Sequence, residues 1–252
     1  MSHIHCFIYT TLAKYLINGR KMHLIDTIQK TVGKLKQRIY AANNDIHCLV
    51  KGNNMKQART IDDKELNLLL LYINTRKHAA RDRLIVLLTH WAGMRIGEVA
   101  ALKLKDVLEI DGTVKQEINL TAEMTKGKFG RAVVLADKLR KEIMAYVKTR
   151  FDSKELIALA YSDLYNKPLL VTQKRDGFNA NTLCYTMHML YKDAGLHGAS
   201  SHSGRRSFIT KLSAKSVPLK VLMEMVGHRN LQTTQRYIDV TQDMKRAAVE
   251  LV

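Results

Sequence analysis

The 252 residues are enough for one large domain, or for a main domain with a small accessory one. Three cysteines without CxxC spacing exclude a disulfide framework and a cysteine-based zinc site, and no apolar run is long enough to span a bilayer. The 41 Lys and Arg residues against 23 Asp and Glu residues give a net charge of +18, which favours a polyanionic partner such as nucleic acid. Charge alone fits a generic basic surface or an RNA-binding protein equally well.

Residues 1–54 are predicted to form a short, basic, helical segment, because apolar residues recur there at helical spacing. These residues are Leu24, Ile28, Val32, Leu35 and Ile39. Such a stripe is more typical of a packing surface than of a DNA-reading helix, and about 50 residues are marginal for an independent domain. The segment is therefore expected either to dock on the main domain or to be disordered. The polar stretch 51–59 predicts a boundary that leaves a main domain of residues 55–252, and Met55 is an alternative start.

The opening residues lack the basic region that precedes the apolar stretch of a signal peptide, and a lysine interrupts their apolar run. The cytoplasm is therefore the expected compartment, and no contact with a membrane is expected. A reducing compartment also suits the three cysteines.

After residue 59 the pattern is mainly helical. Thr60 is the expected cap of a helix with Asp63 in its first turn, and RDRLIVLLTHWAGMR predicts a buried helix that ends near Gly93. The stretch VKQEINLTAEMTKGKFGRAVVLA predicts a β-hairpin around its KGKFG turn. The following helix, in ADKLRKEIMAYVKTRF, is expected to be capped by Asp137 and to bury Leu139, Ile143 and Val147.

The last third of the chain is expected to be dominated by helices from Asn181 onward. Before it, PLLV at residues 168–171 has the composition of a third strand. The C-terminal TQDMKRAAVELV is expected to form a helix whose apolar face carries Met244, Ala247, Ala248 and Val252. The predicted fold class is mainly α with a small antiparallel β-sheet.

Four separated blocks carry residues suited to chemistry on a phosphate. AGMRIGEVAALKLKDV contains Arg95 and Glu98, and TKGKFGRAVVL contains Lys126 at the hairpin turn. SHSGRRSFITKL and VGHRNLQTTQRYIDV supply the remaining candidates, which are His202, Arg205, His228 and Tyr237. Each residue in isolation fits an ordinary capping, packing or surface role, so the interpretation depends on all of them occurring in one order.

These four blocks, in this order, resemble the catalytic domain of the tyrosine recombinase (phage integrase) family, over residues 58–248. The resemblance implies the tyrosine recombinase catalytic-domain fold for residues 55–252. It also implies that Tyr237 cleaves DNA as the nucleophile, forming a 3′-phosphotyrosyl link and freeing a 5′ hydroxyl that can later reseal the strand. Such a reaction needs no ATP, no metal and no other cofactor.

Physical chemistry supports this assignment of roles. The guanidinium groups of Arg95 and Arg205 can each bind two phosphate oxygens and stay charged at any working pH. A tyrosine hydroxyl, with a pKa of about 10, needs a proton acceptor nearby, and His202 can serve as one. Lys126 can protonate the leaving 5′ oxygen, with Lys128 as its rival for that role. His228 can donate a hydrogen bond to a non-bridging oxygen.

Glu98 matches the acidic position of the family and is expected to orient its neighbours. Double-stranded DNA is the expected partner, with backbone contacts from nearby basic residues. The candidates for these contacts are Lys56, Arg59, Lys128, Arg131, Arg206 and Arg229. The family resemblance further implies a homotetramer on two paired sites, with the C-terminal helix docked on a neighbouring subunit, and leaves room for accessory DNA-bending proteins.

Two features depart from the family pattern. Gly204 stands where many members carry a bulkier apolar residue, and residues 1–54 are shorter than the usual helical core-binding domain, which makes them a truncated or atypical DNA-binding region. Two other functions therefore stay open at this point. One is a type IB topoisomerase-like enzyme that nicks and reseals one duplex, and the other is a catalytically weak DNA-binding regulator derived from a recombinase.

Overall fold

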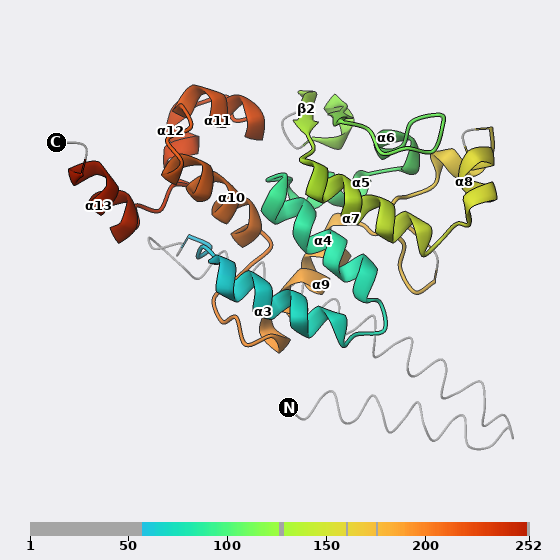
Figure 1. The fold of residues 1–252 in the computed structure, drawn as a ribbon, viewed down its shortest axis with the longest axis horizontal. Coiled ribbons are helices and arrows are strands. Elements are labelled where there is room, and N and C mark those ends of the chain that lie inside the picture. The colour runs from blue at the N-terminus through green and yellow to red at the C-terminus, as the bar shows by residue number, and fades with distance from the viewer. Residues whose placement is uncertain (1–56, 126–128, 160, 175, 251–252) are drawn as a thin grey trace, which may run out of the picture. The chain divides into compact units, whose positions relative to one another are not determined.

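The computed structural model describes residues 57–125, 129–159, 161–174 and 176–250. From Ala58 onward the chain forms one compact unit. The predicted segment 1–54 lies outside the described ranges, so the boundary between residues 54 and 55 stays a prediction. The predicted fold class is confirmed, because the described part is mainly helical with a two-stranded antiparallel sheet (Figure 1).

Helix α4 (Ala79–Trp91) is the central element of this unit, and it packs against α3 (Asp63–Asn74), α7 (Asp137–Lys148) and α10 (Ser203–Ala214). Its residues from Leu84 to His90 are all buried, which confirms the predicted buried helix. An apolar helix of this kind is enclosed on all sides, because every face of it has to leave water. Helix α9 (Ala180–Asp193) packs against α3 and α5 (Ile96–Ala101).

The first predicted cap is displaced by two residues. Asp62, not Thr60, caps α3, since its carboxylate accepts a hydrogen bond from the Glu65 amide at 2.8 Å and Glu65 bonds back to the Asp62 amide at 3.2 Å. This reciprocal pair satisfies two amides that the helix itself leaves unpaired. An aspartate followed by Glu at the third helical position makes a complete capping box, and this is the one that the helix uses.

The cap of α7 is also displaced, by one residue. Ala136 is the N-cap, and Asp137 is the first helical residue, where its carboxylate faces the positive end of the helix dipole. The three residues predicted to be inside this helix are buried, namely Leu139, Ile143 and Val147.

The predicted hairpin is confirmed. Strands β1 (Glu117–Leu120) and β2 (Arg131–Val134) pair antiparallel with Leu120 opposite Arg131, and a short 3-10 helix, η1 (Ala122–Met124), follows β1. The hairpin lies beside α6 (Leu104–Val107) through β1 and beside α11 (Leu219–Val226) through β2. It thus brings β2 close to the C-terminal helices.

The predicted third strand at residues 168–171 is wrong. Pro168 and Val171 make only isolated bridges, to Lys103 and Gly177, and the Leu169 amide donates to the Leu102 carbonyl at 2.8 Å. A proline cannot donate to a ladder, and the two leucines between the bridges are both buried, so the run fills the core instead of extending the hairpin. Helix α8 (Ser153–Leu159) and the 3-10 helix η2 (Asp163–Asn166) precede it.

The C-terminal third is helical, as predicted, with α10 and α11 followed by α12 (Leu231–Gln235) and α13 (Gln242–Val249). Gly204 allows α10 to cross α4 closely, because a Cβ atom there would lie 2.3 Å from the Thr89 hydroxyl. This contact explains the departure of Gly204 from the family pattern. No residue of α13 is buried, and Val252 of its predicted apolar face lies outside the described part.

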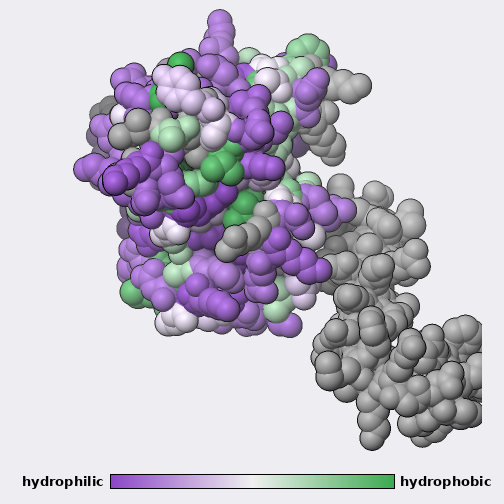
Figure 2. Space-filling model, turned by 90° about the vertical axis from the view of Figure 1, so that its right-hand side faces the viewer, coloured by the Kyte–Doolittle hydropathy of each residue, from purple (hydrophilic) through white to green (hydrophobic). Residues whose placement is uncertain are grey.

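The surface drawn in Figure 2 is mainly hydrophilic, with small apolar areas scattered over the described residues. Within the described ranges, the helices are all too short or too polar to cross a membrane.

Candidate active site

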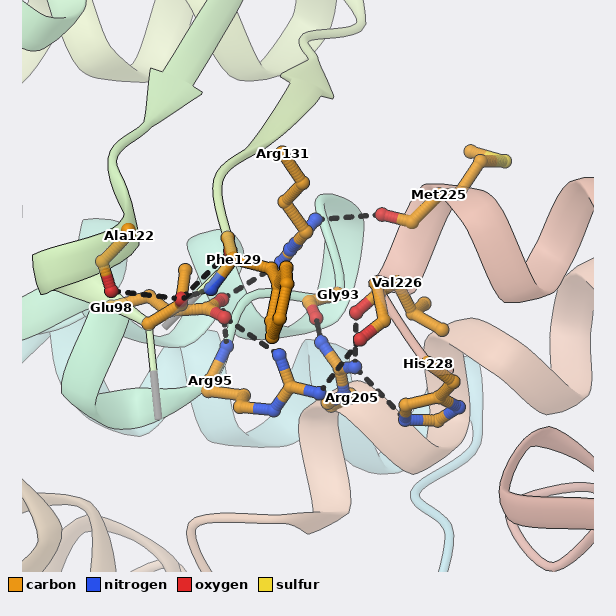
Figure 3. Close-up of polar contacts among 12 residues, drawn as sticks. Gly93, Arg95, Glu98, Ala122, Phe129, Arg131, Arg205, Met225, Val226 and His228 are labelled. Atoms are coloured by element: carbon orange, nitrogen blue, oxygen red, sulfur yellow. Dashed lines mark hydrogen bonds and ion pairs between the residues drawn. The ribbon is translucent and has the colours of Figure 1, made fainter. Parts of the chain in front are cut away.

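Arg205 is the centre of the site, although its side chain is only 1% exposed. Its Nη1 donates to the Gly93 carbonyl at 2.5 Å, and its Nη2 donates to the Val226 carbonyl at 2.5 Å and to Nε2 of His228 at 3.0 Å (Figure 3). Gly93 follows the end of α4, and Val226 ends α11. Carbonyls at helix C-termini lack intrahelical partners and carry partial negative charge, so one guanidinium stabilises both helix ends.

The contacts of His228 determine its tautomer. An arginine only donates, so Nε2 of His228 must accept from Arg205 and carries no proton. Nδ1 then bears the hydrogen and donates to the Thr234 hydroxyl at 3.0 Å. In this arrangement His228 is an acceptor on the side that faces Arg205, and a bond from its Nε2 to a phosphate would first require that nitrogen to gain a proton.

Glu98 is a buried carboxylate shared by two arginines (Figure 3). Arg95 Nη1 donates to it at 2.8 Å and Arg131 Nη2 at 2.7 Å, while the Arg95 amide donates to it at 2.8 Å. Both arginines also reach the end of α11, Arg131 through the Met225 carbonyl at 2.6 Å and Arg95 through the Gly227 carbonyl at 3.3 Å. Glu98 therefore connects the start of α5, the hairpin and the C-terminal helices.

Two glycines make these close approaches possible. Gly93 and Gly227 have φ angles of +61° and +65°, in the left-handed region that ends helices and favours glycine. A Cβ at Gly227 would lie 2.5 Å from Cδ of Arg131, and a Cβ at Gly93 would lie 2.4 Å from the Phe208 ring. Gly227 thus lets the Arg131 stem lie against the backbone at the end of α11.

Tyr237 lies two residues beyond α12 and is half-buried. The centroid of the Tyr237 ring is 5.1 Å from the centroid of the His228 ring and 6.0 Å from the guanidinium carbon of Arg205. Its amide donates to the Thr234 carbonyl at 3.0 Å. The phenol ring therefore belongs to the same cluster as Arg205 and His228.

The cluster carries excess positive charge. Three guanidinium groups, of Arg95, Arg131 and Arg205, surround the single carboxylate of Glu98. Burial alone would raise the pKa of Glu98, but the charge of Arg131 and the hydrogen bonds from Arg95 lower it, so this carboxylate is ionised. Burial, followed by the charges of Arg205 and Arg95, lowers the pKa of His228 to about 3, which keeps the imidazole neutral at pH 7. Burial and the charge of Arg95 also lower the pKa of Arg205. An anion brought to this cluster would relieve that repulsion.

The structure brings together five of the residues singled out in the sequence, namely Arg95, Glu98, Arg205, His228 and Tyr237. His202 is an exposed residue at the N-terminus of α10, one turn before Arg205. Lys126, Lys128 and Lys56 lie outside the described residues. Their expected roles stay predictions.

The four described candidates for DNA contact differ in exposure. Arg131 and Arg206 have side chains only 7% and 9% exposed and are engaged in ion pairs with Glu98 and Asp239, and their contact with DNA stays a prediction. Arg59 pairs with Glu65 at 2.8 Å. Arg229 is exposed, and its guanidinium carbon lies 3.3 Å from the centroid of the Phe129 ring, which is 58% exposed. Of the four, Arg229 retains the geometry of a surface contact.

Sequence reasoning missed the residues that support the cluster from behind. Thr234 orients His228, and Asp239 and Thr210 hold the segment around Tyr237. Helical spacing could have suggested that Thr210 lies near Arg206, because they are four residues apart on α10. Nothing in the sequence pairs Arg206 with Asp239, since only the tertiary fold brings them together. Among the described residues, no group of three His, Cys, Asp or Glu side chains could hold a metal ion.

Known proteins are similar to this chain over most of its described residues. Residues 59–244 match the model of the phage integrase family. The tyrosine recombinase XerA of Thermococcus kodakarensis is 34% identical over 179 residues, which make up 70% of this chain and 56% of that protein. This chain therefore spans little more than half the length of the curated relative.

Solved structures show the same fold. The crystal structure of XerA recombinase gives a TM-score of 0.60 at 20% identity, over 80% of this chain and 66% of that one. The XerH site-specific recombinase bound to a palindromic difH substrate, in a post-cleavage complex, gives 0.58 at 25% identity, over 79% of this chain and 55% of that one.

Proposed function

The chain belongs to the phage integrase family, and on that premise we propose that it is a site-specific DNA recombinase that cleaves and rejoins strands through Tyr237. The observation that carries this proposal is the cluster of three arginines around one carboxylate, in contact with His228 and beside the phenol ring of Tyr237. Buried positive charge next to a potential nucleophile suits a phosphodiester and no neutral substrate.

The proposed reaction is a transesterification. The Tyr237 oxygen attacks phosphorus and loses its proton to a base, while the bond from phosphorus to the 5′ oxygen breaks and that oxygen takes up a proton. His202 is the proposed base and Lys126 the proposed acid. The product is a 3′-phosphotyrosyl ester, which a 5′ hydroxyl can attack in the reverse sense. No metal and no ATP take part in this proposal.

Arg95 and Arg205 have different tasks in the proposed mechanism. The side chain of Arg95 is 28% exposed, and its Nη2 contact with the Gly227 carbonyl is long at 3.3 Å, so Nη2 can exchange this carbonyl for a phosphate oxygen while Nη1 stays on Glu98. Arg205 has short bonds to two helix ends and supplies charge from a fixed position. Such preorganised charge stabilises the pentacoordinate phosphorus without reorganising during the reaction.

His228 receives a narrower role than the sequence suggests. As a neutral acceptor of a bond from Arg205, it fixes the guanidinium and forms part of the wall beside Tyr237. Donation from His228 to a non-bridging oxygen remains a proposal, and it requires a proton that Nε2 lacks while it accepts from Arg205. Glu98 and Arg131 act as positioning residues for Arg95.

The proposed partner is double-stranded DNA, and the net charge of +18 supports it. The XerH relative is described on its difH substrate. We extend the proposal to a homotetramer on two paired sites, with α13 as the exchanged helix, to accessory DNA-bending proteins and to action in the cytoplasm. Arg229 is the described residue proposed to contact the backbone, with Lys56 and Lys128 as further candidates.

The test is capture of a covalent adduct on a nicked suicide substrate, from which the short product dissociates and prevents rejoining. We expect the wild-type chain to form an adduct in excess EDTA, and Tyr237→Phe to bind DNA with unchanged affinity and form none. Adduct formation by Tyr237→Phe would reject Tyr237 as nucleophile. Intact binding with no adduct from the wild type would favour a DNA-binding regulator, and relaxation of supercoils without recombinant product would favour a topoisomerase-like enzyme.

A further inference from the structure

Neighbouring arginines on α10 face two different structures. Arg205 reaches the ends of α4 and α11, whereas Arg206 binds the Asp239 carboxylate with Nε, at 2.9 Å, and with Nη2. Asp239 lies two residues beyond Tyr237. Arg205 of α10 thus binds within the charged cluster, and the next residue, Arg206, binds the segment that carries Tyr237.

The segment after α12 has no regular secondary structure to fix it. Tyr237, Ile238 and Asp239 lie between α12 and α13, in a stretch without helix or strand. Three contacts join it to α10. Besides the bidentate pair to Arg206, the Thr210 hydroxyl donates to the Tyr237 carbonyl at 3.1 Å and accepts from the Asp239 amide at 3.1 Å. The backbone on both sides of Ile238 is therefore bound to one helix.

Burial and geometry set this ion pair apart from ordinary surface pairs. The Arg206 side chain is only 9% exposed and that of Asp239 37%. Two parallel N–H bonds to one carboxylate fix its orientation as well as its distance. The hydrogen bond from Arg206 lowers the pKa of Asp239, so the pair is ionised at neutral pH.

The residue of α10 that follows Arg206 also holds the start of the described unit. The Ile61 amide donates to the Ser207 hydroxyl at 2.7 Å, immediately after Arg206 in the sequence. The chain that enters the catalytic domain and the chain that carries the nucleophile are thus anchored on adjacent residues of one helix.

We propose that Arg206, Asp239 and Thr210 form a latch that positions Tyr237 over the Arg205–His228 cluster of its own chain. This inference rests on the proposed function, since it assigns positioning residues for the Tyr237 reaction. With the latch closed, the phenol is held next to the phosphate site before DNA binds. With the latch open, the three-residue segment moves more freely, and the reacting oxygen spends less time in an attacking position.

The test compares two ion pairs of the same chemistry. Arg83 and Glu142 join α4 to α7 by a bidentate pair at 2.8 and 2.6 Å, outside the candidate site, so Glu142→Gln is the matched control for Asp239→Asn. Single-turnover adduct formation on the suicide substrate is measured for both, with DNA affinity and melting temperature recorded alongside. We expect Asp239→Asn to slow adduct formation about 10- to 100-fold, as a small misplacement of a reacting group does, with DNA affinity unchanged. Glu142→Gln should react at the wild-type rate.

A second set of variants separates positioning from loss of fold. Arg206→Gln alone and the double variant Arg206→Gln/Asp239→Asn should be as slow as Asp239→Asn, because each opens the same latch. Selective 3-fluorotyrosine at position 237 should give a fluorine resonance that shifts in Asp239→Asn, as the ring leaves His228, and stays in place in Glu142→Gln.

Three outcomes would overturn the latch. They are a wild-type rate for folded Asp239→Asn, a slowing equal to that of Glu142→Gln, and additive losses in the double variant. The absence of an adduct from the wild type itself would count against the proposed function, and this result is distinct from all three.

Discussion

Two clusters in this molecule are built around the same arrangement and differ in charge balance. In each, a buried carboxylate is bound by two arginines: Glu98 by Arg95 and Arg131, and Asp82, near the start of α4, by Arg76 and Arg81. Around Asp82 a second carboxylate, Asp193, lies 3.7 Å from Arg76, so two guanidinium groups face two carboxylates.

The cluster around Glu98 gains a third arginine instead. Arg205 joins it without a further carboxylate, and its pKa is lowered by burial and by Arg95. Removing a carboxylate from a balanced set of buried charges leaves an uncompensated charge and destabilises the fold, while an unbalanced set carries repulsion between its like charges. The two clusters contain the same residue types, so residue types alone do not tell a structural ion cluster from a candidate binding site. The balance of charges does distinguish them.

The largest expected effect concerns the structural cluster. Asp82→Asn should lower the free energy of unfolding by about 3–5 kcal/mol, because two partly buried arginines lose their counter-charge. Urea denaturation measures this loss, and Asp137→Asn, whose side chain is 86% exposed in its pair with Arg140, is the control with about 0–1 kcal/mol. A loss for Asp82→Asn no greater than that of the control would break the comparison, since the Asp82 cluster would then not stabilise the fold.

The next effect concerns the cluster around Glu98 and Arg205. Arg205→Lys should slow adduct formation by about 10²–10³-fold, as loss of one preorganised donor does, because an ammonium cannot reach both helix ends and His228 together. Arg81→Lys, in the balanced cluster, should react at the wild-type rate. Single-turnover cleavage of the suicide substrate measures both. Equal slowing of the two variants would mean that charge balance carries no functional information.

A smaller effect on stability is expected where α10 crosses α4. Helix α4 links the two clusters, because it carries Asp82 near its start and is followed by Gly93. Gly204→Ala should destabilise the protein by about 1–3 kcal/mol, because the added methyl overlaps the Thr89 hydroxyl and forces the helices apart. Gly97→Ala, whose Cβ would meet nothing closer than Ala180 at 3.9 Å, should be neutral or stabilising. Thermal denaturation distinguishes the two. A stable Gly204→Ala would show that α10 is not fixed by this contact.

The smallest effect is a dependence of stability on pH. Burial lowers the pKa of His90 to about 3 from 6.5, so the unfolded chain binds a proton that the folded chain refuses. The contribution of this imidazole is fully present above pH 6.5 and is lost as the pH falls towards 3. His90→Gln should therefore reduce the acid slope of the unfolding free energy by about 1.4 kcal/mol per pH unit. Urea denaturation at pH 7, 6 and 5 tests this, and an unchanged slope would contradict it.

The sequence predicts the elements better than their ends. The buried helix of α4, the hairpin and the interior of α7 follow from periodicity, because a repeated apolar spacing specifies a face. The cap of α3 was misplaced by two residues because Thr60 and Asp62 are both good capping residues, and that of α7 by one because its cap is an alanine, which carries no capping signal. PLLV at 168–171 was wrong because a short apolar run has the same composition in a strand and in a core-filling segment.

The sequence predicted which residues form the candidate site, but not the hydrogen bonds and ion pairs between them. Order along the chain selected Arg95, Arg205, His228 and Tyr237, which do lie in one cluster. Basic residues were proposed for DNA contact from their charge, and the sequence did not show that Arg131 and Arg206 form ion pairs with Glu98 and Asp239. Charge is visible in a sequence, but burial is a property of tertiary packing, so a sequence cannot separate an arginine that meets DNA from one that meets a carboxylate.

The hydrogen bonds from Arg205 to the ends of two helices affect how this position is expected to change in evolution. If the proposed activity were lost, the two helix ends would still be bound by this guanidinium, so an arginine at this position does not by itself indicate an active enzyme. Tyr237, half-buried and held largely through its backbone, has no comparable architectural duty. In an inactive relative, Tyr237 should therefore be replaced by other residues sooner than Arg205.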